Sequence, residues 1–227
     1  MCSEPDSNST NALDRGGRWI SLGEALLASG IVLGYNVLHL RWVPNSVFFL
    51  SGLALVSIRL REGSWRAVGL GRPKSWLRMV LLGIAAAVVQ QALGQFVVDP
   101  LTHPWLRYTP AANPLDGVHT TAGILRWLGV IWTYAAFGEE LGYRRYLLTR
   151  VADVGGGTHS ALALGLVWSS VMFGFAHWYQ GPAGFVSATV SGMVFGGVYL
   201  LAGKKLWASI FAHGISDTLA LVATLFG

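Results

Sequence analysis

The sequence predicts an all-α fold, a polytopic bundle of about seven transmembrane helices within a range of six to eight. Hydrophobic residues make up 53% of the 227 residues, charged residues make up 12%, and the mean hydropathy is +0.50. Soluble domains rarely have this composition. Mostly apolar stretches near the roughly 20 residues that a helix needs to cross a bilayer recur along the chain. Short loops rich in Lys and Arg also alternate with loops that have few of them, as expected for membrane topology.

The predicted spans are the mostly apolar stretches, which in chain order are residues 20–40, 43–60, 76–98, 122–151, 161–178, 183–202 and 206–226. The fourth is too long for one span unless it is tilted or projects into water. The polar residues 1–18 before the first span are predicted to be a disordered tail. We divide the rest into membrane helices that act as a scaffold (19–120) and a core that carries the unusual polar residues (121–227). Any chemistry must therefore be done by the helices and their short loops.

Basic residues predict the orientation of the helices. They gather in three connections, which hold Arg61, Arg66, Arg72, Lys74 and Arg78; Arg144, Arg145 and Arg150; and Lys204 and Lys205. With these connections in the cytoplasm, seven spans place the N-terminus there as well. The net charge of +5 is explained by loops that face an anionic leaflet, so we expect the lipid bilayer and no nucleic acid as a partner.

Ionisable residues inside membrane spans are costly, so they are candidates for function. Glu139 and Glu140 are adjacent in the fourth span, and Arg144 follows Glu140 by four residues, the favourable order for an ion pair on one helix face. Glu139 points about 100° away and has no obvious partner in its own helix. The alternative is a helix that emerges into water with a charged surface. Glu24 is interpreted as an interfacial acid in the first helical turn and is left out of the site.

Two histidines follow in later spans. His177 ends the fifth span after Phe173, where an interfacial role is the alternative to a catalytic one. His213 and Asp217 share one face of the seventh span, and a satisfied hydrogen bond in the core is their alternative interpretation. At about 1.5 Å per residue, Glu139 and His177 rise to similar heights above the Gly155 to Gly157 turn, and His213 lies lower. Tilt would allow these residues to converge.

At these residues the chain resembles the CAAX protease and bacteriocin-processing family of intramembrane proteins. The family has an E-E-x-x-x-R helix, an F-x-x-x-H helix and a later H-x-x-x-N helix. The matching residues here are Glu139, Glu140 and Arg144; Phe173 and His177; and His213, with Asp217 in the position of the Asn. The resemblance extends from about residue 121 to the C-terminus.

The resemblance implies a membrane-embedded endopeptidase, in the plasma membrane of a prokaryote, that hydrolyses a membrane-embedded or lipid-anchored peptide or protein. It implies that Glu139 and His177 activate a water and that the last motif holds the oxyanion, with His213 as the donor in our hypothesis. Glu140, Arg144 and Phe173 would support the site. No cofactor is required.

Asp217 departs from the family pattern, because Asn donates a hydrogen bond to an oxyanion and an ionised Asp cannot. Asp217 is therefore expected to be protonated, or to orient His213, or to join Glu139, His177 and His213 in binding a divalent metal such as zinc. The spacing is not that of H-E-x-x-H, so the sequence does not demand zinc.

Two other classes of protein share parts of the pattern. A membrane scaffold or immunity factor of the same family would keep the fold and lose part of the site, and Asp217 favours this alternative. A proton-coupled transporter would also keep buried acids and histidines, but no matched pair of broken spans indicates one. The oligomeric state and the identity of the substrate are left open by the sequence.

Overall fold

The computed structural model describes residues 15–40, 42, 45–102, 104–106, 118 and 120–226. Within this part of the chain, seven long helical segments form the fold and no strand occurs, so the predicted all-α bundle is confirmed. The segments are α1 (Arg15–Asn36); α2 (Ser46–Glu62); α3 (Trp76–Leu93) with η2 (Gly94–Val98) and α4 (Asp99–Thr102); α5 (Thr121–Val130) with η3 (Ile131–Leu148) and α6 (Thr149–Val154); α7 (His159–Ala176); α8 (Gly181–Leu201); and α9 (Leu206–Phe226). Two 3₁₀ turns, η1 (Trp65–Val68) and η4 (Trp178–Gln180), lie in the connections. Of the predicted polar tail, residues 15–18 belong to α1, and residues 1–14 lie outside the described residues.

Local sequence signals explain where the helices begin and end. Asn45 precedes α2, and its side chain accepts hydrogen bonds from the first backbone N–H groups of that helix. Thr158 caps α7 in the same way. Such caps satisfy donors that have no partner within the helix. Gly63 ends α2 with a φ of 66°, a left-handed conformation in which glycine has no steric penalty.

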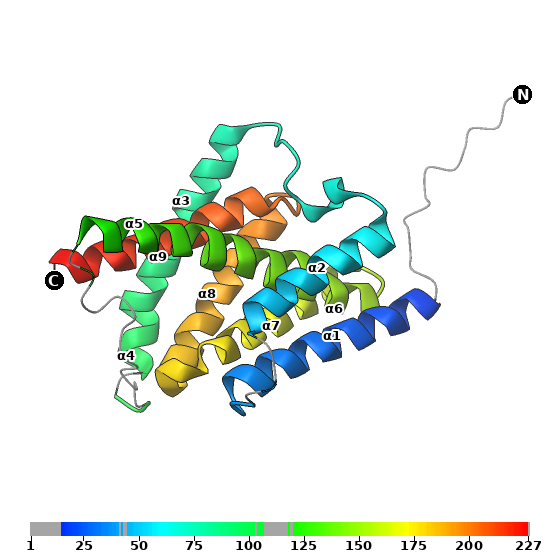
Figure 1. The fold of residues 1–227 in the computed structure, drawn as a ribbon, viewed down its shortest axis with the longest axis horizontal. Coiled ribbons are helices and arrows are strands. Elements are labelled where there is room, and N and C mark those ends of the chain that lie inside the picture. Colours follow the sequence, from blue (N-terminus) through cyan, green and yellow to red (C-terminus); the bar gives the residue numbers. More distant parts are fainter. Residues whose placement is uncertain are drawn as a thin grey trace, which may run out of the picture.

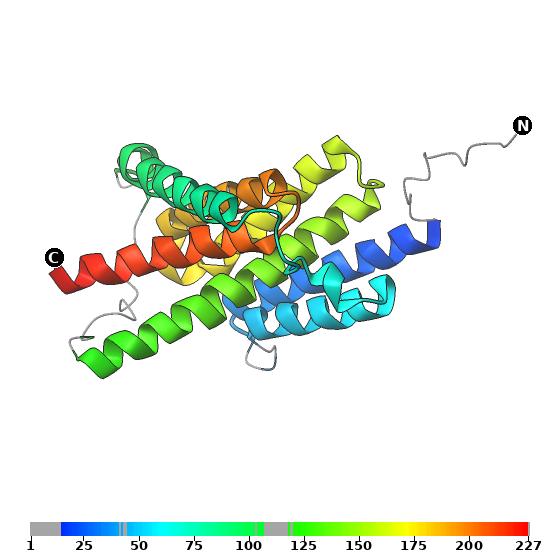
Figure 2. The same cartoon turned by 90° about the horizontal axis from the view of Figure 1, so that it is seen from above.

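The segment that runs from α5 through η3 to α6 is the longest in the bundle. Figures 1 and 2 show that it runs along the molecule, with α9 beside it. It also packs against α2 and α7. Its middle part, η3, is a π-helix. Because π-helical turns are rare and frequently lie at functional sites, η3 is a candidate location for the functional site.

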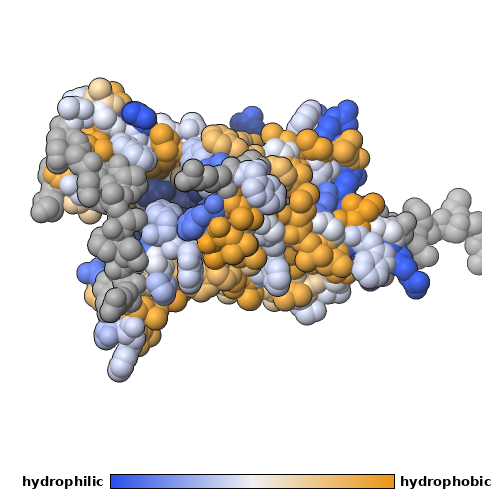
Figure 3. Space-filling model, turned by 60° about the horizontal axis from the view of Figure 1, so that its bottom comes forward, coloured by the Kyte–Doolittle hydropathy of each residue, from blue (hydrophilic) through white to orange (hydrophobic). Residues whose placement is uncertain are grey.

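Among the residues that the structure describes, four helices are long and apolar enough to cross a membrane. They are Trp76–Thr102, His159–Ala176, Trp178–Leu201 and Leu206–Leu225. Each lies at one of the predicted spans, and each of the seven predicted spans contains one of the long helical segments, although α1 ends at Asn36, four residues before the predicted end of the first span. Figure 3 shows the hydrophobic surface of one face of the molecule, which is interrupted by a recess with hydrophilic walls.

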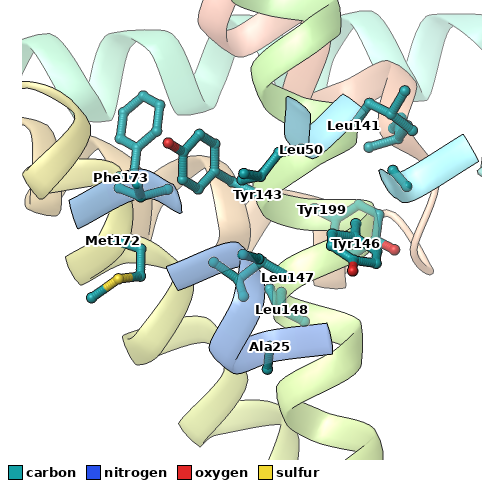
Figure 4. Packing of buried hydrophobic residues seen from close by; sticks show 14 of the residues in the cluster. Ala25, Leu50, Leu141, Tyr143, Tyr146, Leu147, Leu148, Met172, Phe173 and Tyr199 are labelled. Atoms are coloured by element: carbon teal, nitrogen blue, oxygen red, sulfur yellow. The ribbon is translucent and has the colours of Figure 1, made fainter. Parts of the chain in front are cut away.

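The helices approach one another closely around η3, and the buried core is centred there. Figure 4 shows Tyr143 of η3 beside Phe173 of α7, and their rings are 5.2 Å apart. A Cβ atom at Gly165 of α7 would lie 2.5 Å from the Leu148 carbonyl oxygen of η3, and one at Gly192 of α8 would lie 2.9 Å from a backbone atom of α7. Only glycine allows these approaches, and small residues of this kind are typical of close helix packing in membrane proteins.

Ion pairs hold α1, α2 and α6 together at the end of the bundle near the Gly155 to Gly157 turn. Glu24 of α1 lies 2.7 Å from Arg61 of α2 and 3.0 Å from Arg150 of α6. Arg150 and Arg145 of η3 also share Glu62 at the end of α2. Glu24, left out of the site by the sequence, thus takes part in a structural network.

Candidate active site

Three helices bring the predicted site residues together. The site residues are Glu139, Glu140 and Arg144 of η3; Phe173 of α7 with His177 at its C-terminal cap; and His213 and Asp217 of α9. The lower position of His213 expected from residue counting does not separate it from Glu139, because their closest side-chain atoms are 3.9 Å apart. The tilt of the packed helices absorbs the difference in height.

Glu140 is fully buried and is bound from two sides. Its Oε1 atom accepts a hydrogen bond from His213 Nδ1 at 2.9 Å. The same oxygen lies 3.2 Å from Arg144 NH1, so the predicted ion pair along the helix is present. Both side chains of this pair are almost completely shielded from solvent. Glu140 is therefore held within η3 by Arg144 and connects η3 to α9 through His213.

Glu139 is in a different situation, although it is the next residue in the chain. It is buried, and within the described residues its Oε2 atom has no hydrogen-bond partner. Its electrostatic neighbours are His213, His177, Asp217 and Arg144. A buried carboxylate oxygen without a partner is costly, which makes it a candidate for binding a substrate or a water. Glu140 thus has His213 and Arg144 as partners, whereas the Oε2 atom of Glu139 is available to bind a substrate or a water.

Phe173 lies at the centre of these polar groups. The guanidinium of Arg144 is stacked over its ring, with the carbon 4.4 Å from the ring centroid. The ring also lies 4.7 Å from the His177 ring and 5.8 Å from the His213 ring. An aromatic face stabilises a buried cation that has few other partners. Phe173 therefore fixes the positions of the two histidines and the arginine relative to one another.

One hydrogen bond of His177 fixes its tautomer. Its Nδ1 atom lies 2.9 Å from the Phe173 carbonyl oxygen. Because a carbonyl oxygen only accepts, Nδ1 carries the hydrogen and donates it. In the neutral ring, Nε2 is left as an acceptor that can bind the hydrogen of a water.

Asp217 lies at the edge of the site. Its Oδ2 atom is 3.4 Å from His213 Nε2, on the opposite side of the ring from Glu140. Its side chain is 37% exposed, compared with 10% for Glu139. His213 thus lies between two carboxylates, one buried and one open to the surroundings.

Some of these contacts were not predicted from the sequence. The hydrogen bond between Glu140 and His213 joins two motifs that were expected to act separately. Phe195 of α8 stacks on the His213 ring at 4.9 Å and 21°. Nothing distinguishes Phe195 in the sequence, because it is one apolar residue in an apolar helix and no spacing marks it.

The alternative of a divalent metal centre needs Glu139, His177, His213 and Asp217 to converge on one ion. Within the described residues, no group of three or more His, Cys, Asp or Glu side chains is arranged to hold a metal ion. As arranged, the described side chains therefore do not form a metal site.

Comparison with known proteins agrees with this region of the chain. Residues 121–219 match the family model of the Type II CAAX prenyl endopeptidase Rce1-like proteins. No curated protein and no solved structure matches the chain significantly. The matched residues include all seven members of the site, and the family together with the apolar helices indicates an integral membrane protein. The resemblance seen in the three motifs is thus confirmed by the match of residues 121–219 to the model of an Rce1-like domain of the CAAX endopeptidase type.

Proposed function

We propose that this protein is an intramembrane endopeptidase that hydrolyses a peptide bond of a membrane-associated protein or peptide. The observation that carries the proposal is the contrast between two neighbouring acids. Glu140 is bound by His213 and Arg144, whereas the buried Glu139 Oε2 atom has no hydrogen-bond partner among the described residues. The family match supports endopeptidase activity at the level of the family.

In the proposed reaction, Glu139 acts as the general base and His177 helps to hold the water. Glu139 takes a proton from the water while His177 Nε2 accepts the second hydrogen. The water oxygen attacks the carbonyl carbon of the substrate and forms a tetrahedral intermediate. The proton on Glu139 then passes to the leaving nitrogen as the C–N bond breaks. The reaction needs no cofactor.

His213 is the proposed donor to the oxyanion. Its Nδ1–H is held by Glu140, which fixes the orientation of the ring. Its Nε2 atom is 3.4 Å from Asp217 Oδ2, and because a carboxylate accepts hydrogen bonds, this nitrogen donates to Asp217 before the substrate arrives, while Glu139 Oε2 at 3.9 Å stays without a hydrogen bond among the described residues. When the substrate is bound, the same hydrogen turns to the developing oxyanion, where fixed donors contribute most to catalysis. Asp217 is thus a positioning residue that orients His213.

The test compares purified wild-type protein with Glu139→Gln and His177→Ala for cleavage of membrane-anchored peptides, with and without a prenyl group. Loss of a general base typically lowers the rate by a factor of about 10² to 10⁴. Glu24→Gln is the matched control, because Glu24 is an acid of a membrane helix in a structural network away from the site. The proposal is wrong if the folded wild type cleaves none of the substrates, or if Glu139→Gln cleaves as fast as the wild type.

A scaffold or immunity factor of the same family is the second candidate, and Asp217 in the position of the family Asn is the observation in its favour. The two candidates differ in their response to Asp217→Asn. An enzyme keeps or gains activity because Asn restores a donor beside His213, and a scaffold stays inactive.

A further inference from the structure

A pocket of about 350 Å³ lies next to the candidate active site, and most of the described residues that line it lie outside the family match. It is lined by Tyr35, Asn36, His39 and Leu40 from the end of α1 and the turn after it, and by Tyr179 of η4. Pockets of this size bind small molecules or parts of larger ones. The reaction proposed above gives it no role.

Two residues connect this pocket to the site. Tyr179 lies in the turn that directly follows His177, and the two rings are 6.0 Å apart. Tyr134 of η3 precedes Glu139 by five residues, one turn of a π-helix. The phenol of Tyr134 has Glu139 as an electrostatic neighbour, together with the Tyr35 and Tyr179 phenols that line the pocket. The pocket therefore adjoins the candidate active site, with Tyr134 and Tyr179 close to both.

Hydrogen bonds fix the surroundings of the pocket. Asn36 Nδ2 donates to Ser46 Oγ at 3.0 Å, which joins the end of α1 to the start of α2. The Tyr134 hydroxyl donates to Asn45 Oδ1 at 3.0 Å, which joins η3 to the same point. A preformed pocket binds its ligand more tightly, because less side-chain entropy is lost on binding.

We propose that this pocket binds the side chain of a substrate residue next to the bond that is cleaved. This inference rests on the proposed function. The rings of Tyr35 and Tyr179 and the side chain of Leu40 provide apolar walls, so the preferred occupant is a large aliphatic or aromatic side chain. The nearby hydroxyl groups supply hydrogen bonds for the peptide backbone. The first membrane helix thus sets specificity for a reaction that the later helices perform.

The first experiment measures substrate preference. A library of membrane-anchored peptides, varied on both sides of the cleavage site, is cleaved in phosphatidylcholine liposomes and the products are identified by mass spectrometry. Tyr35→Ala is compared with Trp42→Ala, because Trp42 lies in the same connection, is 81% exposed and does not line the pocket. Tyr35→Ala should raise KM about tenfold for peptides with a large apolar residue at one position, change kcat little, and flatten the preference there. Trp42→Ala should change neither. An unchanged preference in Tyr35→Ala overturns the proposal.

A second experiment separates the pocket from the chemistry. The photo-crosslinker p-benzoylphenylalanine is placed at Leu40 or at Trp42 in a Glu139→Gln protein, and the same peptides are added. Cross-links from position 40 and not from position 42 support the pocket, even if the wild type hydrolyses nothing and the proposed function fails. Equal labelling from both positions, or none from either, overturns the pocket even if hydrolysis is observed.

Discussion

Glu139 and Glu140 are predicted to respond in opposite ways to substitution, although they are neighbours in the sequence. Glu140→Ala removes the acceptor of His213 and the ion-pair partner of Arg144, whose side chain is 1% exposed. An interhelical hydrogen bond in a membrane protein contributes about 0.6 to 2 kcal/mol. Leaving one partner of a buried ion pair unpaired costs about 3 to 5 kcal/mol. We therefore expect Glu140→Ala to lower the free energy of unfolding by about 3 to 5 kcal/mol.

Glu139→Gln should not destabilise the protein, because its Oε2 atom loses no hydrogen bond within the described residues. The expected change is between about 0 and 1 kcal/mol in either direction, since replacement of an unpaired buried acid by a neutral amide removes a desolvation cost. The two variants should therefore separate stability from activity, with stability lost in Glu140→Ala and activity lost in Glu139→Gln.

Two assays are run on each purified variant in the same detergent. One follows thermal unfolding, and the other measures peptide cleavage. Glu140→Leu combined with Arg144→Met is the informative control, because it removes both charges and should recover most of the stability without recovering activity. If Glu139→Gln destabilises the protein as much as Glu140→Ala does, the assignment of one structural and one available acid is refuted.

Three further variants test other parts of the structure. Asp217→Asn should retain or increase peptide cleavage, because Asn can donate a hydrogen bond beside His213, and a large loss of kcat would contradict the role given to Asp217. Gly192→Val should lower the free energy of unfolding by about 2 kcal/mol or more, because the added side chain would overpack the contact between α8 and α7. Gly197→Val is the control and should have little effect, because nothing lies within 4 Å of its added Cβ atom. Equal melting temperatures for the two variants would contradict the close packing of α7 on α8. Arg150→Met should lower the melting temperature, because it removes the ion pairs of the buried Arg150 side chain with Glu24, Glu62 and Asp153, and Arg59→Met on the exposed side of α2 is its control.

The helices were predictable from the sequence because each depends on local information. Apolar stretches near the thickness of a bilayer marked all seven, and capping residues such as Asn45 and Thr158 account for where α2 and α7 begin. The π-helical geometry of η3 was not predicted, because its residues have no composition that distinguishes it from an α-helix.

The site was predictable to a different degree. Charged residues in apolar segments identified Glu139, Glu140, His213 and Asp217, because membrane helices rarely tolerate such residues without a reason. Which acid would bind His213 was not predictable, since that depends on how α9 is rotated and tilted against η3. For the same reason the pocket that the end of α1 lines beside His177 was not predictable from the sequence.

The two ends of the α1 and α2 pair are joined by different kinds of bond. At one end, Glu24 and Glu62 are shared among arginines, whereas at the other a neutral hydrogen bond connects Asn36 to Ser46. Charge-assisted contacts are about twice as strong as neutral ones, so η3 is expected to separate from the α1 and α2 pair at the Asn36 end, as on a hinge with its pivot at the charged end. A membrane peptide would then enter sideways from the bilayer at the Tyr35 end. Spin labels on α1 and η3 should report distances that widen at that end when a peptide is added and stay constant at the charged end; uniform distances would argue against a hinge.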